Sequence, residues 1–545
     1  MSIQKRSHLL TSLWQLSIGR LLIGGLLFRS IIAYFLPLGF DEAYYFLYVQ
    51  NLDWSYFDHP PAVAITSGLG VWMTGTATPF ALRLGALILF TASLWLLYAT
   101  GKWLFGSRAG LISSAIASLT PLFFLSFGVL AAPDNALIFF WSLTLYLCAR
   151  EFFPSVTAKS TLYQYRPTAR IVFISLAIGL ACLSKYHGFL LAISVAAFCL
   201  TSKSHRTVFR SKWLGWGLLI FGVTLFPLLY WNATHDWISL RFQLGDRFAE
   251  YGDDSSGYSF ISLLGVILAQ FGYLFPSIAL PLWWTSAKAL FDQLTSKPFD
   301  TSRTCNQQTA NKINFILWSG LPTALGFTLV GGATHTFPAW PAPGLWSLVI
   351  LLGYVATLCP TKRIHRWLSV SAWTIGILLM FALTHITLGT LQESGDRALF
   401  GGIIPIGTDP STELIDAMQL RSRFEQSEEF SSAIDTASFV ITSKYWLSGY
   451  AALAMPEDIA LPVSSFTTDP RGHAFWFEPQ QWIGKDALLI SLDGEARMEE
   501  VDAIAPYFET ITPLTKITTR RGGEVSETFY LYKAENLRRP YLYPY

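Results

Sequence analysis

Charged residues are scarce in this chain. Asp, Glu, Lys and Arg make up only 14% of its 545 residues, whereas hydrophobic residues make up 52%. A soluble protein of this size would need far more charge to cover its surface. Because apolar runs long enough for a membrane-spanning helix recur instead, the composition predicts a polytopic α-helical membrane protein.

Several other signals are missing from the sequence. Its five cysteines are scattered, without the spacing of a metal site or a disulfide framework. No basic block accompanies the net charge of +2, so no nucleic-acid partner is indicated. There is no glycine-rich phosphate loop, which argues against a nucleotide-sugar fold, and no internal repeat.

Eleven apolar stretches are predicted to cross the membrane. A twelfth candidate, 61–73, is too short to cross comfortably and is expected to form an interfacial helix of the first external loop. The eleven stretches are 15–38, 83–103, 109–128, 133–150, 170–186, 187–201, 213–231, 259–286, 313–332, 339–359 and 366–389.

The basic residues set the orientation of these spans. If 61–73 lies in the interface, the basic loops between later spans share one side with Lys5 and Arg6, as the positive-inside rule requires. Counting 61–73 as a crossing would break that pattern. The sequence therefore predicts an amino terminus inside, where the first apolar stretch, lacking a small-residue cleavage site, is a retained signal anchor.

The segment 39–61 gathers ionisable residues directly after the first span. Placing carboxylates and an imidazole at a membrane edge costs free energy, so such residues are expected to have a function and this segment is a candidate site. The alternative is an interfacial aromatic belt with solubilising acids, although a belt needs no such crowding. Tyr45 and Tyr56 fit either view, since they are candidates for stacking on a sugar or prenyl group. The candidate polar site residues here are Asp41, Glu42, Asp58 and His59.

Polar residues of later loops fall on the same side in the predicted topology. Such a gathering is typical of a catalytic or binding cavity at the bilayer edge, because polar residues with only structural roles would be distributed over both membrane faces. The residues concerned are Asp134, Lys185, His187, Arg247 and His335.

After residue 389 the composition changes. Residues 390–545 are richer in Asp, Glu, Ser and Thr, and they alternate strand-like runs (SFVITS, DALLISL, TFYLYK) with helix-like segments (YWLSGYAALAM, EARMEEVDAIAPYF). This alternation predicts a small α/β domain outside the cytoplasm, following a transmembrane domain of residues 1–389. With no nucleophile elbow, it is expected to be a lid or acceptor-docking domain.

These segments resemble the GT-C membrane glycosyltransferases of family 39, the branch of the protein O-mannosyltransferases and lipid A aminoarabinose transferases. Asp41-Glu42 in GFDEAYY looks like the acidic pair of the first external loop, and Phe57–Pro61 like an aromatic–acid–basic–Pro–Pro segment. In the aminoarabinose transferases lysine usually precedes the paired prolines, whereas His59 stands here. Further similar segments are Pro133–Asp134, Leu183–Lys185 and Trp340–Pro343.

The resemblance implies a GT-C fold and a bacterial inner-membrane enzyme. Its donor would be a polyprenyl-phosphate sugar, and its acceptor an extracytoplasmic glycolipid, glycan, lipid or protein hydroxyl. Direct displacement by the acceptor would invert the sugar carbon. Asp41 would be the base, and Lys185, His59 and Arg247 would meet the leaving phosphate.

Several residues keep a second interpretation. Glu42 is a catalytic partner, a metal ligand or an orienting neighbour of Asp41. Asp134 is either a site residue or the cap of its helix, and Asp58 either a site residue or a neutralising partner of His59. Arg29, mid-span, is expected to pair with a polar group of another helix. No cofactor is indicated, although the external histidines and acids permit a divalent metal.

Two rival classes remain open. A lipid-linked oligosaccharide polymerase or ligase shares the topology and the lipid substrate, but normally uses large arginine-rich external loops. A secondary transporter would have its polar residues near the bilayer midplane and repeated halves. Sugar transfer accounts best for the acids at one membrane edge.

Overall fold

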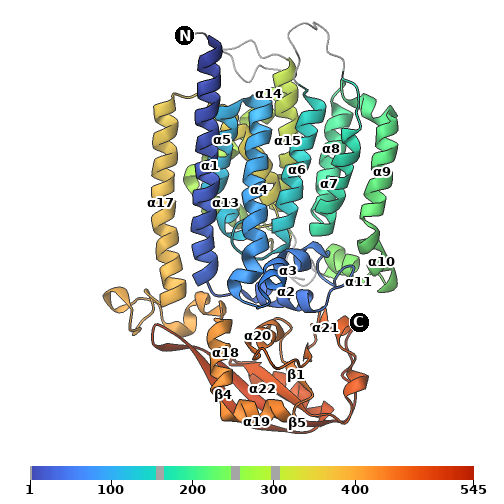
Figure 1. The fold of residues 1–545 in the computed structure, drawn as a ribbon, viewed down its shortest axis with the longest axis vertical. Coiled ribbons are helices and arrows are strands. Elements are labelled where there is room, and N and C mark those ends of the chain that lie inside the picture. Colours follow the sequence, from blue (N-terminus) through green and yellow to red (C-terminus); the bar gives the residue numbers. More distant parts are fainter. Residues whose placement is uncertain (1–2, 155–164, 247–257, 296–306) are drawn as a thin grey trace. The chain divides into compact units, whose positions relative to one another are not determined.

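The computed structural model describes residues 3–154, 165–246, 258–295 and 307–545, which form two structural units (Figure 1). The first unit is made of Met1–Ser30, His59–Val63 and Gly85–Ile377. The second is made of Ile31–Asp58, Ala64–Leu84 and Leu378–Tyr545. The predicted boundary at residue 389 stays a prediction.

The first unit is helical. Its elements are α1 (Ile3–Phe35), α4 (Pro79–Phe105), α5 (Ser107–Leu119), α6 (Pro133–Phe152), α7 (Arg170–Ser184), α8 (Gly188–Thr201), α9 (Lys212–Thr224), α10 (Phe226–Thr234), α11 (Ile238–Arg241), α13 (Phe260–Leu274), α14 (Pro276–Leu294), α15 (Gln307–Val330), α16 (Ala342–Ala356) and α17 (Thr361–Leu388). Helices α1, α4 and α17 also supply residues to the second unit.

Four of the described helices are each long and apolar enough to cross a membrane: α1, α4, α15 and α17. Two bent pairs, α9 with α10 and α13 with α14, raise this number to six if each pair counts as one span. The number eleven therefore stays a prediction. The stretch 259–286 is not one straight helix, because the chain bends by 117° where Phe275 adopts a positive φ before Pro276.

Buried polar side chains join the helices of the first unit. The indole of Trp141 on α6 donates to Ser347 Oγ on α16 (2.8 Å), and Trp346 of α16 returns a bond to Ser142 Oγ of α6 (2.9 Å). A buried indole N–H needs such an acceptor, so the two bonds fix how these helices pack. Arg29 donates to Thr91 Oγ1 of α4 (2.9 Å), which confirms its predicted interhelical pairing.

The second unit contains a mixed five-stranded sheet. Its strands are β1 (Phe439–Thr442), β2 (Val463–Ser465), β3 (Ala487–Leu492), β4 (Phe508–Arg521) and β5 (Glu524–Leu537), in the order β2-β1-β3-β5-β4. Strand β1 pairs in parallel with β2 and β3, whereas β5 pairs antiparallel with β3 and β4. Its helices are α2 (Phe40–Gln50), α3 (Ala62–Thr74), α18 (Ala417–Glu425), α19 (Glu428–Thr436), α20 (Leu447–Ala454), α21 (His473–Trp476) and α22 (Arg497–Ile504).

The predicted fold class is confirmed: a helical membrane-protein architecture with a small C-terminal α/β domain. All three strand-like runs and both helix-like segments fold as expected. The stretch 61–73 forms α3, whose 13 residues are too few to span a bilayer.

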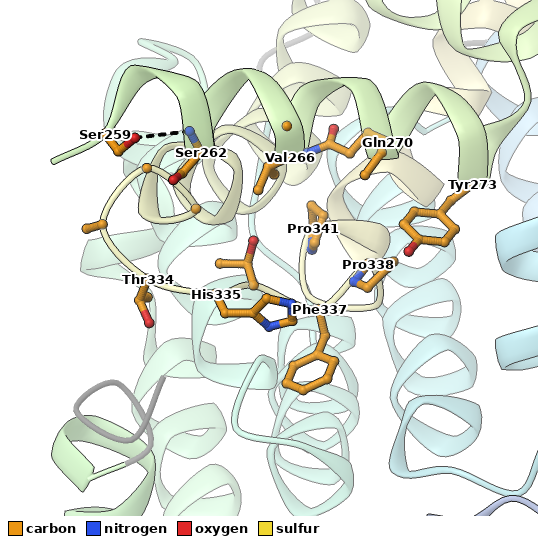
Figure 2. Close-up of a pocket in the computed structure, with 16 residues that line it drawn as sticks. Ser259, Ser262, Val266, Gln270, Tyr273, Thr334, His335, Phe337, Pro338 and Pro341 are labelled. Carbon is orange, nitrogen blue, oxygen red and sulfur yellow. Dashed lines mark hydrogen bonds between the residues drawn. The ribbon is translucent and has the colours of Figure 1, made fainter. Parts of the chain in front are cut away.

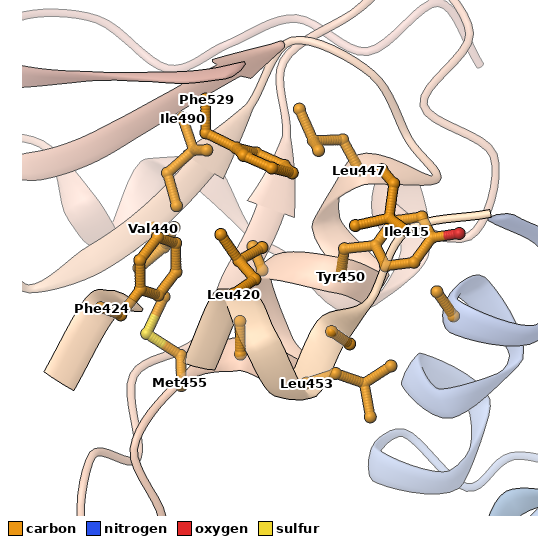
Figure 3. Close-up of a cluster of buried hydrophobic side chains, with 14 of the residues drawn as sticks. Ile415, Leu420, Phe424, Val440, Leu447, Tyr450, Leu453, Met455, Ile490 and Phe529 are labelled. Carbon is orange, nitrogen blue, oxygen red and sulfur yellow. The ribbon is translucent and has the colours of Figure 1, made fainter. Parts of the chain in front are cut away.

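Helix α2, which carries the acidic pair, packs on the core of the second unit. Ala43 and Phe46 of α2 belong to one buried apolar cluster with residues of α18, α20 and the sheet. Figure 3 shows part of this cluster, with Leu420 of α18, Leu447 of α20 and Val440 of β1 among the labelled residues. Gly449 of α20 permits this contact, because a Cβ there would lie 2.2 Å from the Ala43 carbonyl oxygen. The C-terminal fold therefore holds the acid-bearing helix in place.

Candidate active site

The first turn of α2 presents its two acids differently. Asp41 is exposed, whereas Glu42 is buried. Glu42 accepts a bond from the Gly39 backbone N–H (3.1 Å), as the N3 residue of a helix often does. Of the two adjacent carboxylates, Glu42 is thus fixed inside the unit, whereas Asp41 is exposed.

Arg83 of α4 anchors Glu42 in the second unit. Its Nε and Nη2 lie 2.8 and 2.5 Å from the two carboxylate oxygens, in a bidentate pair. The remaining N–H groups donate to backbone carbonyl oxygens at the end of α1, so every donor of this fully buried guanidinium is used. These acceptors are Ala33 (3.0 Å), Leu36 (2.6 Å) and Pro37 (2.8 Å).

Arg83→Gln should lower the free energy of unfolding by about 3–5 kcal/mol, because Glu42 would remain buried without its cation. Thermal unfolding in detergent measures this loss. The double variant Arg83→Gln/Glu42→Gln removes both charges and should recover part of it. A single variant as stable as the wild type would show that the pair does not hold α2.

Aromatic rings in the same unit pack around Tyr48, whose hydroxyl binds Asp58. Tyr56 stacks on Tyr48 at 3.8 Å, and Tyr45 lies 5.6 Å from the Tyr48 ring. The Tyr48 hydroxyl donates to Asp58. Both Tyr45 and Tyr56 are buried, so their packing fixes the segment that bears Asp58, and their substrate-stacking role stays a prediction.

Arg471 is the cation beside Asp58. Its Nη1 lies 3.4 Å from Asp58 Oδ2, and its Nε donates to Asp469 (3.1 Å). The guanidinium also lies over the Tyr445 ring, 4.0 Å from the centroid. Asp58 thus pairs with an arginine that the sequence pattern did not indicate, and its expected neutralisation of His59 stays a prediction.

His473, the first residue of α21, is fully buried in this unit. Its Nε2 lies 2.7 Å from Ser448 Oγ, and burial lowers its pKa to about 4. The unfolded chain binds a proton near pH 6.5, so the neutral folded state loses stability as the pH falls from about 6.5 to about 4, by about 3 kcal/mol in total.

His473→Gln should therefore flatten the pH dependence of stability between pH 7 and 4.5. The unfolding temperature of the variant and of the wild type, measured at both pH values, tests this. His365→Gln changes an exposed histidine and should behave like the wild type. Equal acid sensitivity in all three proteins would remove His473 as the cause.

In the first unit, Lys185 and Asp134 form a buried ion pair. Lys185 follows α7, and its Nζ lies 2.9 and 2.8 Å from the two oxygens of Asp134 at the start of α6. The N-cap of α6 is instead Ala132, whose backbone N–H donates to Oδ1 of Asn135 in the first turn (2.7 Å). The capping interpretation of Asp134 is therefore wrong. The ion pair with Lys185 instead places a positive and a negative charge together at the first turn of α6.

Lys185 lines an apolar cavity of about 380 Å³ in the first unit. His59 and His187 also line this cavity, so three predicted site residues come together here. The rest of the lining is largely apolar and suits a lipid chain next to a charged end. It includes Phe189, Leu190, Leu240, Leu244, Phe327 and Trp340.

His335 lines a second cavity of about 530 Å³, shown in Figure 2. Ser259, Ser262, Gln270 and Tyr273 contribute polar groups from the segment of α13, so this cavity is suited to a ligand rich in hydroxyl groups.

An aromatic series links the two cavities. The His335 ring lies 5.2 Å from Phe337, and Phe337 lies 5.7 Å from Trp340. Trp340 contacts Phe327 (5.5 Å), on which His187 stacks (4.7 Å). The cavities therefore lie side by side in the first unit.

Two further expectations concern Arg247 and a metal. Arg247 lies outside the described residues. Within the described part of the chain, no three His, Cys, Asp or Glu side chains are grouped as metal ligands.

The sequence is similar to that of a known protein family and of a known sugar-transferring enzyme. The family model described as dolichyl-phosphate-mannose-protein mannosyltransferase matches residues 58–231. The lipid A galacturonosyltransferase RgtD of Rhizobium johnstonii is 23% identical over 386 residues, which cover 70% of this chain and 73% of RgtD.

Two crystal structures of ArnT from Cupriavidus metallidurans share the fold. The apo structure has a TM-score of 0.57 at 14% identity, covering 94% of this chain and 97% of that one. The structure bound to undecaprenyl phosphate has a TM-score of 0.55 at 13% identity, covering 95% and 98%. Together these similarities support the predicted GT-C membrane glycosyltransferase of the PMT-like branch.

The family match confirms the predicted enzyme class, a membrane glycosyltransferase. Two structurally central arginines of this glycosyltransferase were missed as partners in the sequence. Arg83 opens a predicted span, and Arg471 stands in the run DPRGHAFW. An arginine that follows an acid and stands shortly before two aromatic residues is the signal that could have indicated Arg471.

Proposed function

We propose that this glycosyltransferase transfers a sugar from a polyprenyl phosphate to an extracytoplasmic glycolipid. The observation that supports this best is Lys185 on the wall of an otherwise largely apolar cavity. A cation at one end of an apolar cavity suits a phosphate that carries a long hydrocarbon chain. The undecaprenyl phosphate named in the second ArnT structure supports the same ligand class.

The donor phosphate would lie at Lys185, His59 and His187, with its prenyl chain along Phe189 and Leu240. Asp134 orients the Lys185 side chain (2.8 Å) before the donor arrives. Arg247 is proposed as a further cation. As the sugar leaves, negative charge grows on the phosphate, and these cations stabilise it more in the transition state than in the bound donor.

Asp41 is proposed as the base. The acceptor hydroxyl loses its proton to this carboxylate, and its oxygen forms a bond to the anomeric carbon. The bond from that carbon to the phosphate oxygen breaks, and the polyprenyl phosphate leaves with the electron pair. A single displacement of this kind inverts the sugar carbon. Glu42, held by Arg83, positions the helical turn that bears Asp41.

The cavity of His335 is proposed as the place of the acceptor headgroup, because its lining offers several hydrogen-bonding groups. A lipid A-type glycolipid is favoured by the similarity to RgtD. The family description names a protein acceptor, so a protein hydroxyl is the second candidate. In either case we place the reaction on the outer face of the bacterial inner membrane, with residues 390–545 on the same side.

The test is transfer by the purified protein, given a panel of undecaprenyl-phosphate sugars and a lipid A acceptor. Mass spectrometry should detect a glycosylated acceptor and free undecaprenyl phosphate. Release of polyprenyl diphosphate would instead indicate a polymerase or ligase. Substrate movement across vesicles without any product would indicate a transporter.

A further inference from the structure

A third cavity, of about 900 Å³, lies in the first unit. It lies near the end of α6, whereas the Lys185–Asp134 pair lies near the start of that helix. It is lined by Lys102 of α4, Arg150 of α6 and Lys312 of α15. Asp134 begins α6 and Arg150 lies near its end, so about 24 Å of helix separates this cavity from the Lys185–Asp134 pair. The proposed transfer reaction makes no use of it.

Neutral groups hold the three cations in place. The Arg150 guanidinium donates to the Tyr146 hydroxyl (2.8 Å) and lies over the Trp103 ring, 4.1 Å from its centroid. Lys312 donates to the Leu104 carbonyl oxygen (2.8 Å), and Lys102 lies 5.7 Å from the Tyr98 ring. Stacking on an aromatic face orients a guanidinium while leaving other N–H groups available for a ligand.

No carboxylate balances these charges in the described structure. None of the described residues that line the cavity is acidic, and none of the three cations has an ion pair with another described residue. The acid next to Arg150, Glu151, is used elsewhere. It accepts bonds from Tyr165 (2.9 Å) and Thr168 and pairs with Arg170 (3.2 Å). Three half-buried positive charges therefore share one cavity.

We propose that this cavity binds a phosphate group, carried as the headgroup of an anionic membrane lipid. Basic pockets between transmembrane helices on the cytoplasmic side are suited to anionic headgroups, and the predicted topology places these cations on that side. Trp95 of α4, together with Ile18 and Leu22 of α1, adds an apolar wall for an acyl chain. The molecule would thus hold two phosphates, one near each membrane face.

Binding of phosphatidylglycerol by the delipidated full-length protein tests the proposal, with native mass spectrometry and thermal unfolding as readouts. Lys102→Gln/Arg150→Gln should weaken binding about thirtyfold, since each cation near an anionic headgroup contributes ~1 kcal/mol. Lys102→Gln/Lys312→Gln gives the same test if loss of Arg150 impairs folding. Lys362→Gln/Arg363→Gln is the control, because it removes two exposed cations of α17.

The comparison arms identify the source of the phosphate. Phosphatidylglycerol that stabilises the protein where inorganic phosphate and phosphatidylcholine do not supports a lipid headgroup. Stabilisation by inorganic phosphate alone, lost in the same variants, supports a phosphate site but overturns the lipid. Equal binding by the wild type and both cavity variants would overturn the whole proposal.

Discussion

Asp41→Asn is expected to lower the rate of sugar transfer by about 10²–10⁴-fold, the usual contribution of a general base. The amide keeps the shape of the side chain but accepts no proton from the acceptor hydroxyl. Because Asp41 is exposed while Glu42 bears the buried ion pair, the variant should fold and insert normally. Single-turnover kinetics and the unfolding temperature, measured on the same preparation, give both quantities.

Asp435→Asn is the matched control for this prediction. Asp435 is an exposed acid on α19 of the same unit, and its replacement changes the charge equally. The control should transfer sugar at the wild-type rate. If Asp41→Asn did so too, Asp41 would have no part in the chemistry, and the base would have to be sought among the other acids.

Lys185→Met should have the second large effect, on both activity and stability. The leaving phosphate loses a cation, so transfer should fall by about 10²–10³-fold, the loss typical when one charge-stabilising donor is removed. Asp134, whose side chain is only 7% exposed, would then be buried without its partner. That loss should destabilise the protein by about 3–5 kcal/mol.

The double variant Lys185→Met/Asp134→Asn separates these two effects. It removes both charges, so the unfolding temperature should return toward the wild-type value. Transfer should stay low, because the phosphate still lacks the Lys185 cation. If the double variant recovered activity together with stability, Lys185 would serve only to neutralise Asp134.

The sequence predicted most of the fold because its signals are local. Apolar length, the break at Lys185–His187 between α7 and α8, and the alternation in SFVITS and DALLISL each depend on neighbouring residues. Strand β4 was missed, because Pro513 interrupts the run FETITPLTKITTRR and only four of its 14 residues are buried. The division of 259–286 depends on Phe275, whose positive φ no pattern predicts.

The site was predictable in its residue types but not in its partners. The acidic pair Asp41–Glu42, His59 before two prolines, and Lys185 at the end of an apolar run stand out in the sequence. The partner of Glu42 is 41 residues away, and that of Asp58 is 413 residues away, so only the folded chain could identify Arg83 and Arg471. Only the folded chain likewise shows that Asn135, and not the preceding Asp134, accepts the bond from the backbone N–H of Ala132 at the start of α6.

The C-terminal fold was expected to be a lid or docking domain. Its cluster with Ala43 and Phe46 adds a supporting function, since α2 packs on α20 within one unit. Damage to this sheet should therefore affect the acidic turn as well as any acceptor contact.

The most direct test of the central claim is the affinity of the protein for undecaprenyl phosphate, measured for the wild type and for Lys185→Met/Asp134→Asn. The account predicts that the wild type binds the lipid phosphate and is stabilised against unfolding in proportion to the logarithm of its concentration. The double variant should bind at least about tenfold more weakly, having lost a charge-assisted contact. Equal affinities, or no binding by the folded wild type, would contradict the assignment of this cavity to a lipid-borne donor.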